Sequence, residues 1–313
     1  MIKPPPNLPT VDGQRSQHVS PTFDNLTTRY GFQWCPGCGN FAILNTIKFA
    51  LIDLDRDPSS VVCVSDIGQA GKLPMWLNVH GFHGLHGRAL PFAQGVKIAN
   101  PALTVLCVSG DGGAYGEGTG HFVHACRRNV ALTYLVHDNS TYALTTGQAS
   151  ATTLPGTKTP TTPGGPLEPA LNPLQLAIAS GATFVARVWA GDQAHFQEIL
   201  VEAIKHPGLA VIDVLQPCVI WNKVQTWQSW QARVRRLDTT LDTSDRNRAF
   251  VAAAGQWNQH IDVGIFYRER RATFESQVGN LVELPVATQT VTAKDIEPIL
   301  QDLMGQEKPD VAG

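Results

Sequence analysis

The sequence lacks the features that mark several large classes of protein. Its formal net charge is only −2 over 313 residues and no long basic run appears, so nucleic acid is not expected as a partner. No apolar stretch is long enough to span a bilayer, and we expect no membrane association. Residues 1–20 are polar and rich in proline, unlike a secretory signal peptide. We therefore expect a cytoplasmic protein.

Cysteine is scarce: the chain has six, and no secretory signal accompanies them. In a reducing cytoplasm, thiols bind metal or stay buried more often than they form disulfides. Cys63 and Cys107 lie inside apolar runs, which predicts that both are buried in the core. Cys35 and Cys38 form a Cys-Pro-Gly-Cys turn that could hold a metal together with Cys218. Spacing alone favours structural zinc there, and leaves a redox dithiol and an iron–sulfur cluster as open alternatives.

The most informative stretch runs from Gly110 to Asn139. It begins where the apolar run 104–109 stops at Gly-Asp-Gly, and it ends where the run 131–136 stops at Asp-Asn. Between the two runs, apolar residues recur every three to four positions, which predicts a helix. A strand, a helix and a parallel strand need about thirty residues. Such a unit brings Asp111 and Asn139 together at the carboxyl ends of neighbouring strands, where open sheets bind their ligands.

The residue types in this stretch predict a magnesium-bridged diphosphate site. Asp111 and Asn139 supply the hard oxygen ligands that Mg²⁺ prefers. Gly110 and Gly112 let the backbone approach a phosphate closely, and the following helix turns its amide end towards it. The alternative is an ordinary strand–helix–strand unit in which the Asp and the Asn only make turns.

The rest of the chain continues the alternation of strands and helices. Strands are expected at 61–64, 183–189, 209–215 and 263–267, and helices at 41–51, 91–99, 173–180, 192–206 and 293–304. The pattern predicts an α/β fold with a doubly wound, mostly parallel sheet. Residues 149–173 are rich in Thr, Pro and Gly, and are expected to form a functional or interface loop.

Three histidines, His80, His83 and His86, recur every three residues in a Gly-rich loop. A metal site is the weaker interpretation, because the loop is not helical and nothing fixes the three rings on one face.

Several motifs resemble those of the β subunit of two-subunit 2-oxoacid:ferredoxin oxidoreductases. The spacing from Gly-Asp-Gly to Asn139 resembles the thiamine-diphosphate fingerprint, and further similar stretches lie at 34–40, 86–93, 119–122, 145–150 and 216–218. The resemblance runs from about Tyr30 to Lys223. It implies a sheet of the thiamine-diphosphate-binding type.

The resemblance also implies roles for individual residues. Asp111, the Asn139 side chain and the Thr141 carbonyl would bind Mg²⁺. Further cofactor-binding positions would be Gly68, Gly110, Gly112 and Leu144. Catalytic positions would be His86 and Arg88 at the edge of the thiamine pocket, and Lys72 near the substrate carboxylate. The alternative for Lys72 is a solvated loop lysine.

For the cysteines, the resemblance favours an iron–sulfur cluster over the structural zinc site that spacing alone favours. It implies a 4Fe–4S cluster bound by Cys35, Cys38 and Cys218. The fourth family cysteine would fall at Gln69, and a neutral glutamine is a poor substitute for a thiolate. Because the other three positions are intact, we expect the cluster to be kept, with a fourth ligand from elsewhere, such as a carboxylate or thiolate of a partner subunit.

The implied activity is thiamine-diphosphate-dependent oxidative decarboxylation of a 2-oxo acid, in which coenzyme A takes the acyl group and ferredoxin takes the electrons. The reaction would be reversible, fixing CO₂ in the other direction. An α subunit would supply the carboxylate that activates the aminopyrimidine, in an αβ or (αβ)₂ assembly. Leu144 before Thr145 resembles the 2-oxoglutarate branch rather than the pyruvate branch, but that branch commonly has lysine where Thr146 stands.

The sequence pattern and the resemblance together imply three parts of the chain: an extended arm at 1–23, a diphosphate-binding domain with the iron–sulfur ligands at 24–223, and an extension at 224–313 that packs on the partner subunit. A small independent domain is the alternative for the extension. Two other functions stay open, namely a non-oxidative thiamine-diphosphate enzyme subunit such as a decarboxylase or transketolase half, and a zinc-stabilised interaction module.

Overall fold

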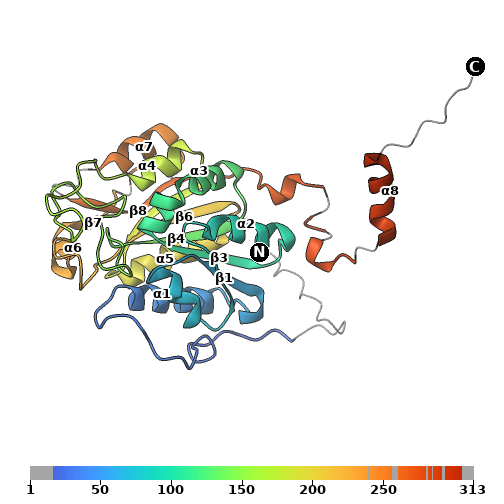
Figure 1. The fold of residues 1–313 in the computed structure, drawn as a ribbon, viewed down its shortest axis with the longest axis horizontal. Helices are drawn as coiled ribbons and strands as arrows, with labels where there is room; N and C mark the ends of the chain where they lie inside the picture. Colours follow the sequence, from blue (N-terminus) through green and yellow to red (C-terminus); the bar gives the residue numbers. More distant parts are fainter. Residues whose placement is uncertain are drawn as a thin grey trace, which may run out of the picture.

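A computed structural model describes residues 17–238, 240–255, 260–279, 281–283, 285–290 and 293–304. Most of the expected N-terminal arm, residues 1–16, lies outside the described residues. An eight-stranded sheet forms the centre of the chain, in the order β2-β1-β3-β4-β6-β5-β8-β7 (Figure 1). In the described part of the chain, no helix is both long enough and apolar enough to cross a membrane.

The strands are β1 (Val61–Ser65), β2 (His80–His83), β3 (Thr104–Gly110), β4 (Leu132–Asp138), β5 (Phe184–Trp189), β6 (Leu209–Leu215), β7 (Val234–Arg236) and β8 (Ile261–Arg268). The helices are α1 (Asn40–Asp53), α2 (Ala89–Ala99), α3 (Thr119–Arg128), α4 (Pro173–Ala179), α5 (Gln193–Lys205), α6 (Trp227–Arg233), α7 (Arg246–Ala254) and α8 (Ala293–Leu303).

The sheet is mostly parallel, as the sequence predicts. Strands β1 to β6 pair in parallel, β8 pairs antiparallel with β5, and β7 pairs in parallel with β8. Strands covered by helices on both faces are buried throughout, and β1, β4 and β6 are accordingly continuous runs of buried residues. Their apolar runs made them easy to predict.

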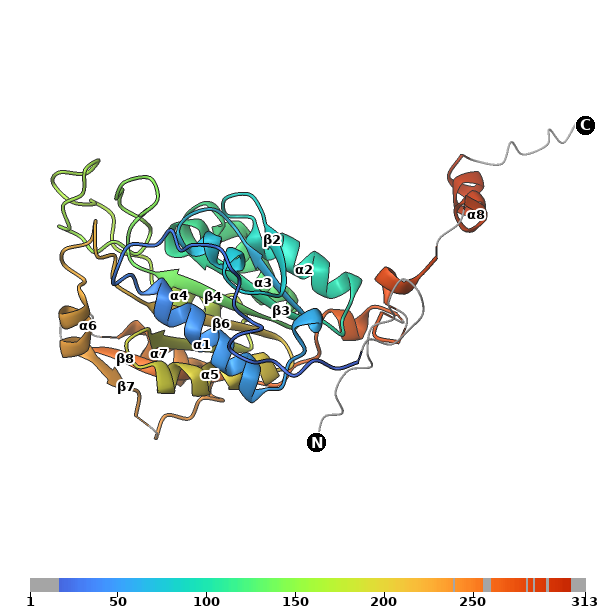
Figure 2. The same cartoon turned by 90° about the horizontal axis from the view of Figure 1, so that it is seen from below.

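Helices cover both faces of the sheet (Figures 1 and 2). Helices α1 and α5 pack together on one face, where Ile43, Ile47 and Phe196 join the core. Helices α2, α3, α4 and α7 lie on the other face, where Phe122 and Ile178 join a second core cluster. The doubly wound architecture expected from the alternating pattern is therefore confirmed.

The segment His80–His83, expected as a loop, is the edge strand β2, so that prediction was wrong. It pairs in parallel with β1, from Val62 opposite His80 to Ser65 opposite His83. All four side chains of β2 are exposed. An exposed edge strand leaves no burial pattern in the sequence, which explains why periodicity missed it.

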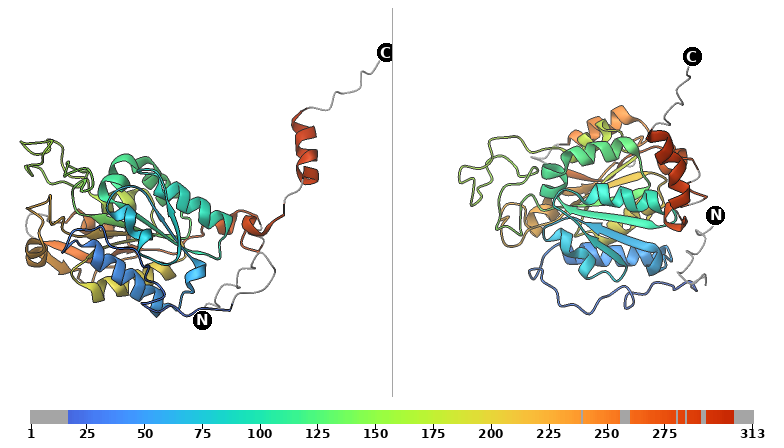
Figure 3. Two further views of the ribbon diagram at one scale, coloured as in Figure 1. Left: turned by 60° about the horizontal axis from the view of Figure 1, so that its bottom comes forward. Right: turned by 45° about the vertical axis from the view of Figure 1, so that its right-hand side comes forward.

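The sheet also continues past Lys223, where the apolar pattern loosens. Elements α6, β7, α7 and β8 follow, and β8 lies beside β5 with a register shift between Val185 and Ala186. The boundary expected after Lys223 therefore does not coincide with a break in the sheet. Among the described helices, α8 stands apart from the sheet and its covering layers (Figures 1 and 3).

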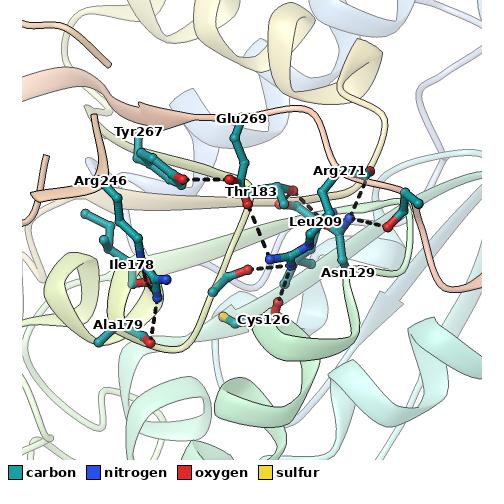
Figure 4. A network of polar contacts seen from close by, with 12 residues as sticks. Cys126, Asn129, Ile178, Ala179, Thr183, Leu209, Arg246, Tyr267, Glu269 and Arg271 are labelled. Atoms are coloured by element: carbon teal, nitrogen blue, oxygen red, sulfur yellow. Dashed lines mark hydrogen bonds and ion pairs between the residues drawn. The ribbon is translucent and has the colours of Figure 1, made fainter. Parts of the chain in front are cut away.

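A network of polar contacts ties the segment after β8 to the end of α3 and to the starts of β5 and β6 (Figure 4). Asn129 ends α3 with a φ of 58°, and its Oδ1 accepts hydrogen bonds from Thr183 Oγ1 at 2.6 Å and from the Leu209 amide at 2.9 Å. Its Nδ2 donates to the carbonyl of Ala272 at 3.2 Å. Arg271 in turn donates to the carbonyl of Gly181 at 2.7 Å. One buried amide thus joins α3, β5, β6 and the chain that follows β8.

We predict that Asn129→Ala lowers the free energy of unfolding by about 2 to 4 kcal/mol, because it removes the acceptor of the buried Leu209 amide and one of the partners of the buried Thr183 hydroxyl. Asn129→Gly should lose somewhat less, since glycine adopts the left-handed conformation without strain. Urea unfolding followed by tryptophan fluorescence measures both. Equal stability of Asn129→Ala and the wild type would contradict the structural role of this network.

Candidate functional site

A pocket of about 450 Å³ opens at the carboxyl ends of β1, β3 and β4. Its walls are formed by Ile67, Gly68, Gln69, Ala70, His86, Gly110, Asp111, Gly112, Gly113, Glu117, His137, Asn139, Thr141, Tyr142, Ala143, Leu144, Thr145 and Gln148. Parallel pairing places Gly110 of β3 opposite His137 of β4, so Asp111 and Asn139 leave the sheet at the same edge. This is the ligand-binding edge that the strand–helix–strand pattern predicts.

The structure brings most of the sequence-predicted site residues into this one pocket. The residues concerned are Gly68, His86, Gly110, Asp111, Gly112, Asn139, Thr141 and Leu144. Lys72 and Arg88 do not line the pocket. The Lys72 ammonium donates to Gln33 Oε1 at 3.0 Å, and the Arg88 guanidinium donates to the Glu117 carbonyl at 3.2 Å.

Asp111 is a buried acid held by hydroxyl groups. Its Oδ2 accepts hydrogen bonds from Ser150 Oγ and from Thr152 Oγ1, the latter at 2.9 Å. The residue is 1% exposed, and burial raises the pKa of its carboxyl group to about 6 despite these hydrogen bonds. A buried carboxylate of this kind is stabilised by a cation.

A second buried acid, Asp138, shares a donor with Asp111. Thr152 Oγ1 lies 2.9 Å from Asp111 Oδ2 and 2.8 Å from Asp138 Oδ1, and a hydroxyl has only one proton to donate. Burial, together with the charges of Asp213 and Asp111, raises the pKa of Asp138 well above its usual range. The two carboxyl groups are therefore linked through one hydroxyl, and burial opposes the charge of both.

The donor atoms around Asp111 fit a divalent cation of the magnesium type. Asn139 Oδ1 accepts from the Thr141 amide at 3.0 Å, which folds residues 139–141 into a tight turn at the pocket wall. The Asn139 carbonyl is fixed by Asn222 Nδ2 at 3.1 Å. A carboxylate, a carboxamide and a backbone carbonyl are the hard oxygens that Mg²⁺ takes, with water and phosphate completing its shell.

The segment after Gly-Asp-Gly differs from the prediction. A wide π-helical turn, η3 (Gly112–Glu117), comes first, and α3 begins only at Thr119. Such turns concentrate at functional sites because they re-aim side chains. Here the turn lines the pocket with Gly112, Gly113 and Glu117.

His137 connects the pocket with the segments that carry the cysteines. Its Nδ1 lies 2.9 Å from Asn40 Oδ1, which also accepts from Gln216 Nε2 at 2.9 Å. Since Asn40 Oδ1 can only accept, His137 Nδ1 carries the hydrogen and Nε2 is an acceptor. Among the described residues Nε2 has no hydrogen-bond partner. Burial lowers the pKa of His137 to about 3, so the ring is neutral.

The three expected ligand cysteines belong to segments that pack against each other. Gly39 is needed here, because a Cβ at this position would lie 2.5 Å from Gln216 Oε1. Burial raises the pKa of the Cys38 thiol to about 11, and the charges of Cys218 and Cys35 raise it further. Within the described ranges, no three His, Cys, Asp or Glu side chains are grouped so that they could hold a metal ion.

Gln69 lies between the pocket and the cysteine turn. The Gln69 carbonyl accepts a hydrogen bond at 2.8 Å from Nε1 of Trp34, the residue before Cys35. Gln69 also lines the pocket. In the part of the chain that the structure describes, the buried Gln69 Oε1 has no hydrogen-bond partner.

The three histidines of the β2 region have separate partners. His80 Nε2 lies 3.1 Å from the Ser59 carbonyl, and His83 Nδ1 lies 2.8 Å from the Gly71 carbonyl. His86 Nε2 lies 3.1 Å from Glu117 Oε2 in the pocket.

Sequence reasoning missed four polar residues at or behind the pocket wall: Asp66, Glu117, His137 and Tyr142. Two of them carry a signal in hindsight. Asp66 directly follows β1, just as Asp111 follows β3. Glu117 is the first acid after Asp111 in the glycine-rich stretch. His137 lies inside an apolar run, and Tyr142 follows a turn, so neither stands out.

Comparisons with known proteins agree with this architecture. Residues 62–214 match the family described as thiamine pyrophosphate enzyme, C-terminal TPP binding domain. Residues 218–283 match the family described as the C-terminal part of the pyruvate ferredoxin oxidoreductase beta chain. The first match contains the whole pocket edge from β1 to β6, so the chain carries a thiamine-diphosphate-binding domain.

Individual relatives share most of the chain. The 2-oxoacid:ferredoxin oxidoreductase subunit beta of Saccharolobus solfataricus is 42% identical over 86% of this chain and 95% of its own length. The 2-oxoglutarate synthase subunit KorB of Archaeoglobus fulgidus is 40% identical over 79% of this chain and 89% of its own.

A solved structure is also similar. It is the 2-oxoglutarate:ferredoxin oxidoreductase of Magnetococcus marinus with 2-oxoglutarate, coenzyme A and succinyl-CoA bound. It matches with a TM-score of 0.82 and 31% identity, covering 93% of this chain and 97% of the matched chain. With the pocket, the strand order and the relatives in agreement, the chain belongs to the β subunits of the 2-oxoacid:ferredoxin oxidoreductases, which are enzymes that work together with an α subunit.

Proposed function

We propose that this chain, with its α subunit, catalyses the oxidative decarboxylation of a 2-oxo acid to its coenzyme A ester, and that the electrons leave through an iron–sulfur cluster to ferredoxin. The observation that carries the proposal is the juxtaposition of two sites. The oxygen ligands Asp111 and Asn139 line the pocket, and the hydrogen-bonded row His137–Asn40–Gln216 leads from that pocket to the cysteine segments.

The residues of the pocket have distinct tasks in this proposal. Asp111, Asn139 and the Thr141 carbonyl hold Mg²⁺, which binds the diphosphate of the cofactor. Gly110 and Gly112 leave room for that diphosphate along the backbone, and Gly68 and Leu144 border the remainder. When bound, thiamine diphosphate supplies the nucleophilic carbon and takes up the electrons released with CO₂. Apolar wall residues such as Ile67 and Ala143 exclude water.

We propose that Cys35, Cys38 and Cys218 bind a 4Fe–4S cluster. A four-iron cluster spreads its thiolates over different irons, so its ligands need not be gathered as tightly as those of a single ion. Burial and the charges of the other two cysteines raise the pKa of the Cys38 thiol, and a positive metal would favour its thiolate form. The fourth ligand comes from outside this chain, since Gln69 is a neutral amide.

For the substrate we favour 2-oxoglutarate. Two proteins similar to this chain, from Archaeoglobus fulgidus and Magnetococcus marinus, carry 2-oxoglutarate in their names. Leu144 lies at the pocket wall and is 39% exposed. The Lys72 ammonium is bound to Gln33, and Thr146 is uncharged, so the cation for the second carboxylate of the substrate comes from the α subunit.

The complex of this chain with its α subunit should turn over 2-oxoglutarate faster than pyruvate when coenzyme A and a dye acceptor are supplied. Asp111→Asn should abolish turnover and weaken magnesium-dependent binding of thiamine diphosphate at least about a hundredfold, because a neutral amide is a poorer magnesium ligand. Steady-state rates and calorimetry provide the measurements.

The matched control is Asp24→Asn, which changes an exposed carboxylate that does not line the pocket and should leave binding and turnover intact. Faster turnover of pyruvate would overturn the substrate assignment alone. Undiminished cofactor binding in Asp111→Asn would overturn the assignment of the pocket.

The purified complex should be brown and contain about four iron and four sulfide per αβ pair beyond any clusters of the α subunit. Cys38→Ser should lose that amount of iron, since a serine oxygen replaces one of the thiolate ligands of the cluster. Cys126→Ala, which removes a buried thiol of α3, should keep it. Zinc in place of iron, or equal iron in both variants, would contradict the cluster.

We also propose that α8 binds the α subunit, in keeping with a C-terminal extension that packs on the partner. Ile299 and Leu303 on this helix are 59% and 77% exposed, although apolar faces of helices are normally covered.

Replacing Ile299 and Leu303 by aspartate should weaken assembly with the α subunit at least about tenfold, because both side chains lose their apolar contacts. Size-exclusion chromatography over a dilution series measures the dissociation. Asp302→Asn on the same helix is the control and should assemble like the wild type. Unchanged assembly of the double variant would place the contact elsewhere.

A further inference from the structure

At the pocket wall, the imidazole of His86 lies between two carboxylates. His86 Nε2 is 3.1 Å from Glu117 Oε2, and His86 Nδ1 is 3.9 Å from Asp66 Oδ2. Among the described residues Nδ1 has no hydrogen-bond partner, although it is buried. The side chains of Asp66, His86 and Glu117 are 0%, 35% and 43% exposed, so the row leads from the core to the open pocket.

The position of Asp66 is built into the fold. Its Oδ2 accepts from the Gly87 amide at 3.2 Å, directly after His86 in the chain. A Cβ at residue 113 would lie only 2.1 Å from the same oxygen, so only glycine leaves room for this carboxyl group. The π-helical turn that carries Gly113 also carries Glu117. The π-helical turn therefore carries Glu117 and leaves room for Asp66, so that both acids lie beside the imidazole of His86.

Glu117 is held at the outer end of the row. The Tyr142 hydroxyl lies 3.1 Å from each of its carboxylate oxygens, and this tyrosine lines the pocket too. Arg88 does not neutralise the acid, because its guanidinium donates to the Glu117 backbone carbonyl. The carboxylate is thus oriented by a neutral donor.

The surroundings of Asp66 favour proton exchange near neutral pH. Burial raises the pKa of Asp66 to about 7, and the charge of Glu117 acts in the same direction. Two further titratable groups face Asp66 from the sheet, Cys107 of β3 and Tyr134 of β4. Burial raises the pKa of each well above its usual range, so both keep their protons. The exchangeable proton therefore resides among Asp66, His86 and Glu117.

We propose that Asp66, His86 and Glu117 form a proton path in which Asp66 stores the proton, His86 carries it, and Glu117 delivers it to an oxygen atom of the ligand in the pocket. The Asp66 carboxyl proton passes to His86 Nδ1 while the Nε2 proton passes to Glu117. Glu117 then protonates the ligand oxygen that becomes negative, and Asp66 is left as the carboxylate. Asp66 and His86 must approach by about 1 Å, a tightening that is common when a ligand binds.

The identity of the ligand rests on the proposed function: when a nucleophile adds to the 2-oxo carbon of a 2-oxo acid before cleavage, negative charge develops on the carbonyl oxygen, which then needs a proton donor. The path itself depends only on residues of this chain. It can be tested by a spectroscopic readout that needs no turnover.

The first measurement is an infrared pH titration of the complex with the α subunit, in which the wild type is compared with Asp66→Asn. The difference spectrum between the two proteins should contain the carbonyl stretch of the protonated Asp66 carboxyl group. This band should disappear as the pH rises, with a midpoint near the Asp66 pKa of about 7. In His86→Gln this midpoint should move by at least about half a pH unit, since coupled groups share their titration. In the control His80→Gln, whose imidazole lies on the exposed edge strand, it should stay in place.

The second measurement is the pH profile of 2-oxo acid turnover. Asp66→Asn and Glu117→Gln should each lower kcat about tenfold to a hundredfold and remove the transition near neutral pH, with little change in KM. Glu117 is exposed, so its variant keeps the test valid if Asp66→Asn does not fold.

A midpoint unaffected by His86→Gln, or wild-type pH profiles in both carboxylate variants, would overturn the path. A complex that turns over no 2-oxo acid but shows the coupled infrared titration would overturn the proposed function and leave the path standing.

Discussion

Parallel pairing of β1, β3 and β4 is the constraint on which the site depends. Because all three strands point the same way, the residues that follow them meet at one edge of the sheet. Asp66, Asp111 and Asp138 all lie there and are at most 1% exposed. Burying three acids so close together is costly without compensation. The fold compensates with hydroxyl donors, namely Ser150 and Thr152 on Asp111 and Thr152 on Asp138.

Much of this arrangement could be predicted from the sequence, because the relevant signals are local. The apolar runs of β3 and β4 and the spacing from Asp111 to Asn139 are enough to bring these two residues together. The edge strand β2 could not be predicted, since exposed side chains leave no burial pattern. Of the strands after Lys223, β8 was predicted at 263–267, whereas β7, which has no buried residue, was not.

The polar residues that were missed depend on contacts between distant segments. Glu117 reaches the pocket only because the chain after Gly-Asp-Gly winds as a π-helical turn, and no propensity marks that turn. His137 lies in an apolar strand and acquires its role from Asn40 and Gln216, which are distant in the sequence. Lys72 shows the reverse case: the family resemblance placed it near the substrate carboxylate, yet it does not line the pocket and its ammonium donates to Gln33.

The two hydroxyl groups that hydrogen-bond to Asp111 connect the pocket edge with a distant part of the chain. Ser150 and Thr152 belong to the long segment between β4 and α4, which projects from the end of the sheet (Figure 2). Both hydroxyls bind the same carboxylate oxygen, Oδ2. The segment is therefore tied to the end of β3 through one atom, and removing the Asp111 carboxylate would release both hydroxyl contacts together.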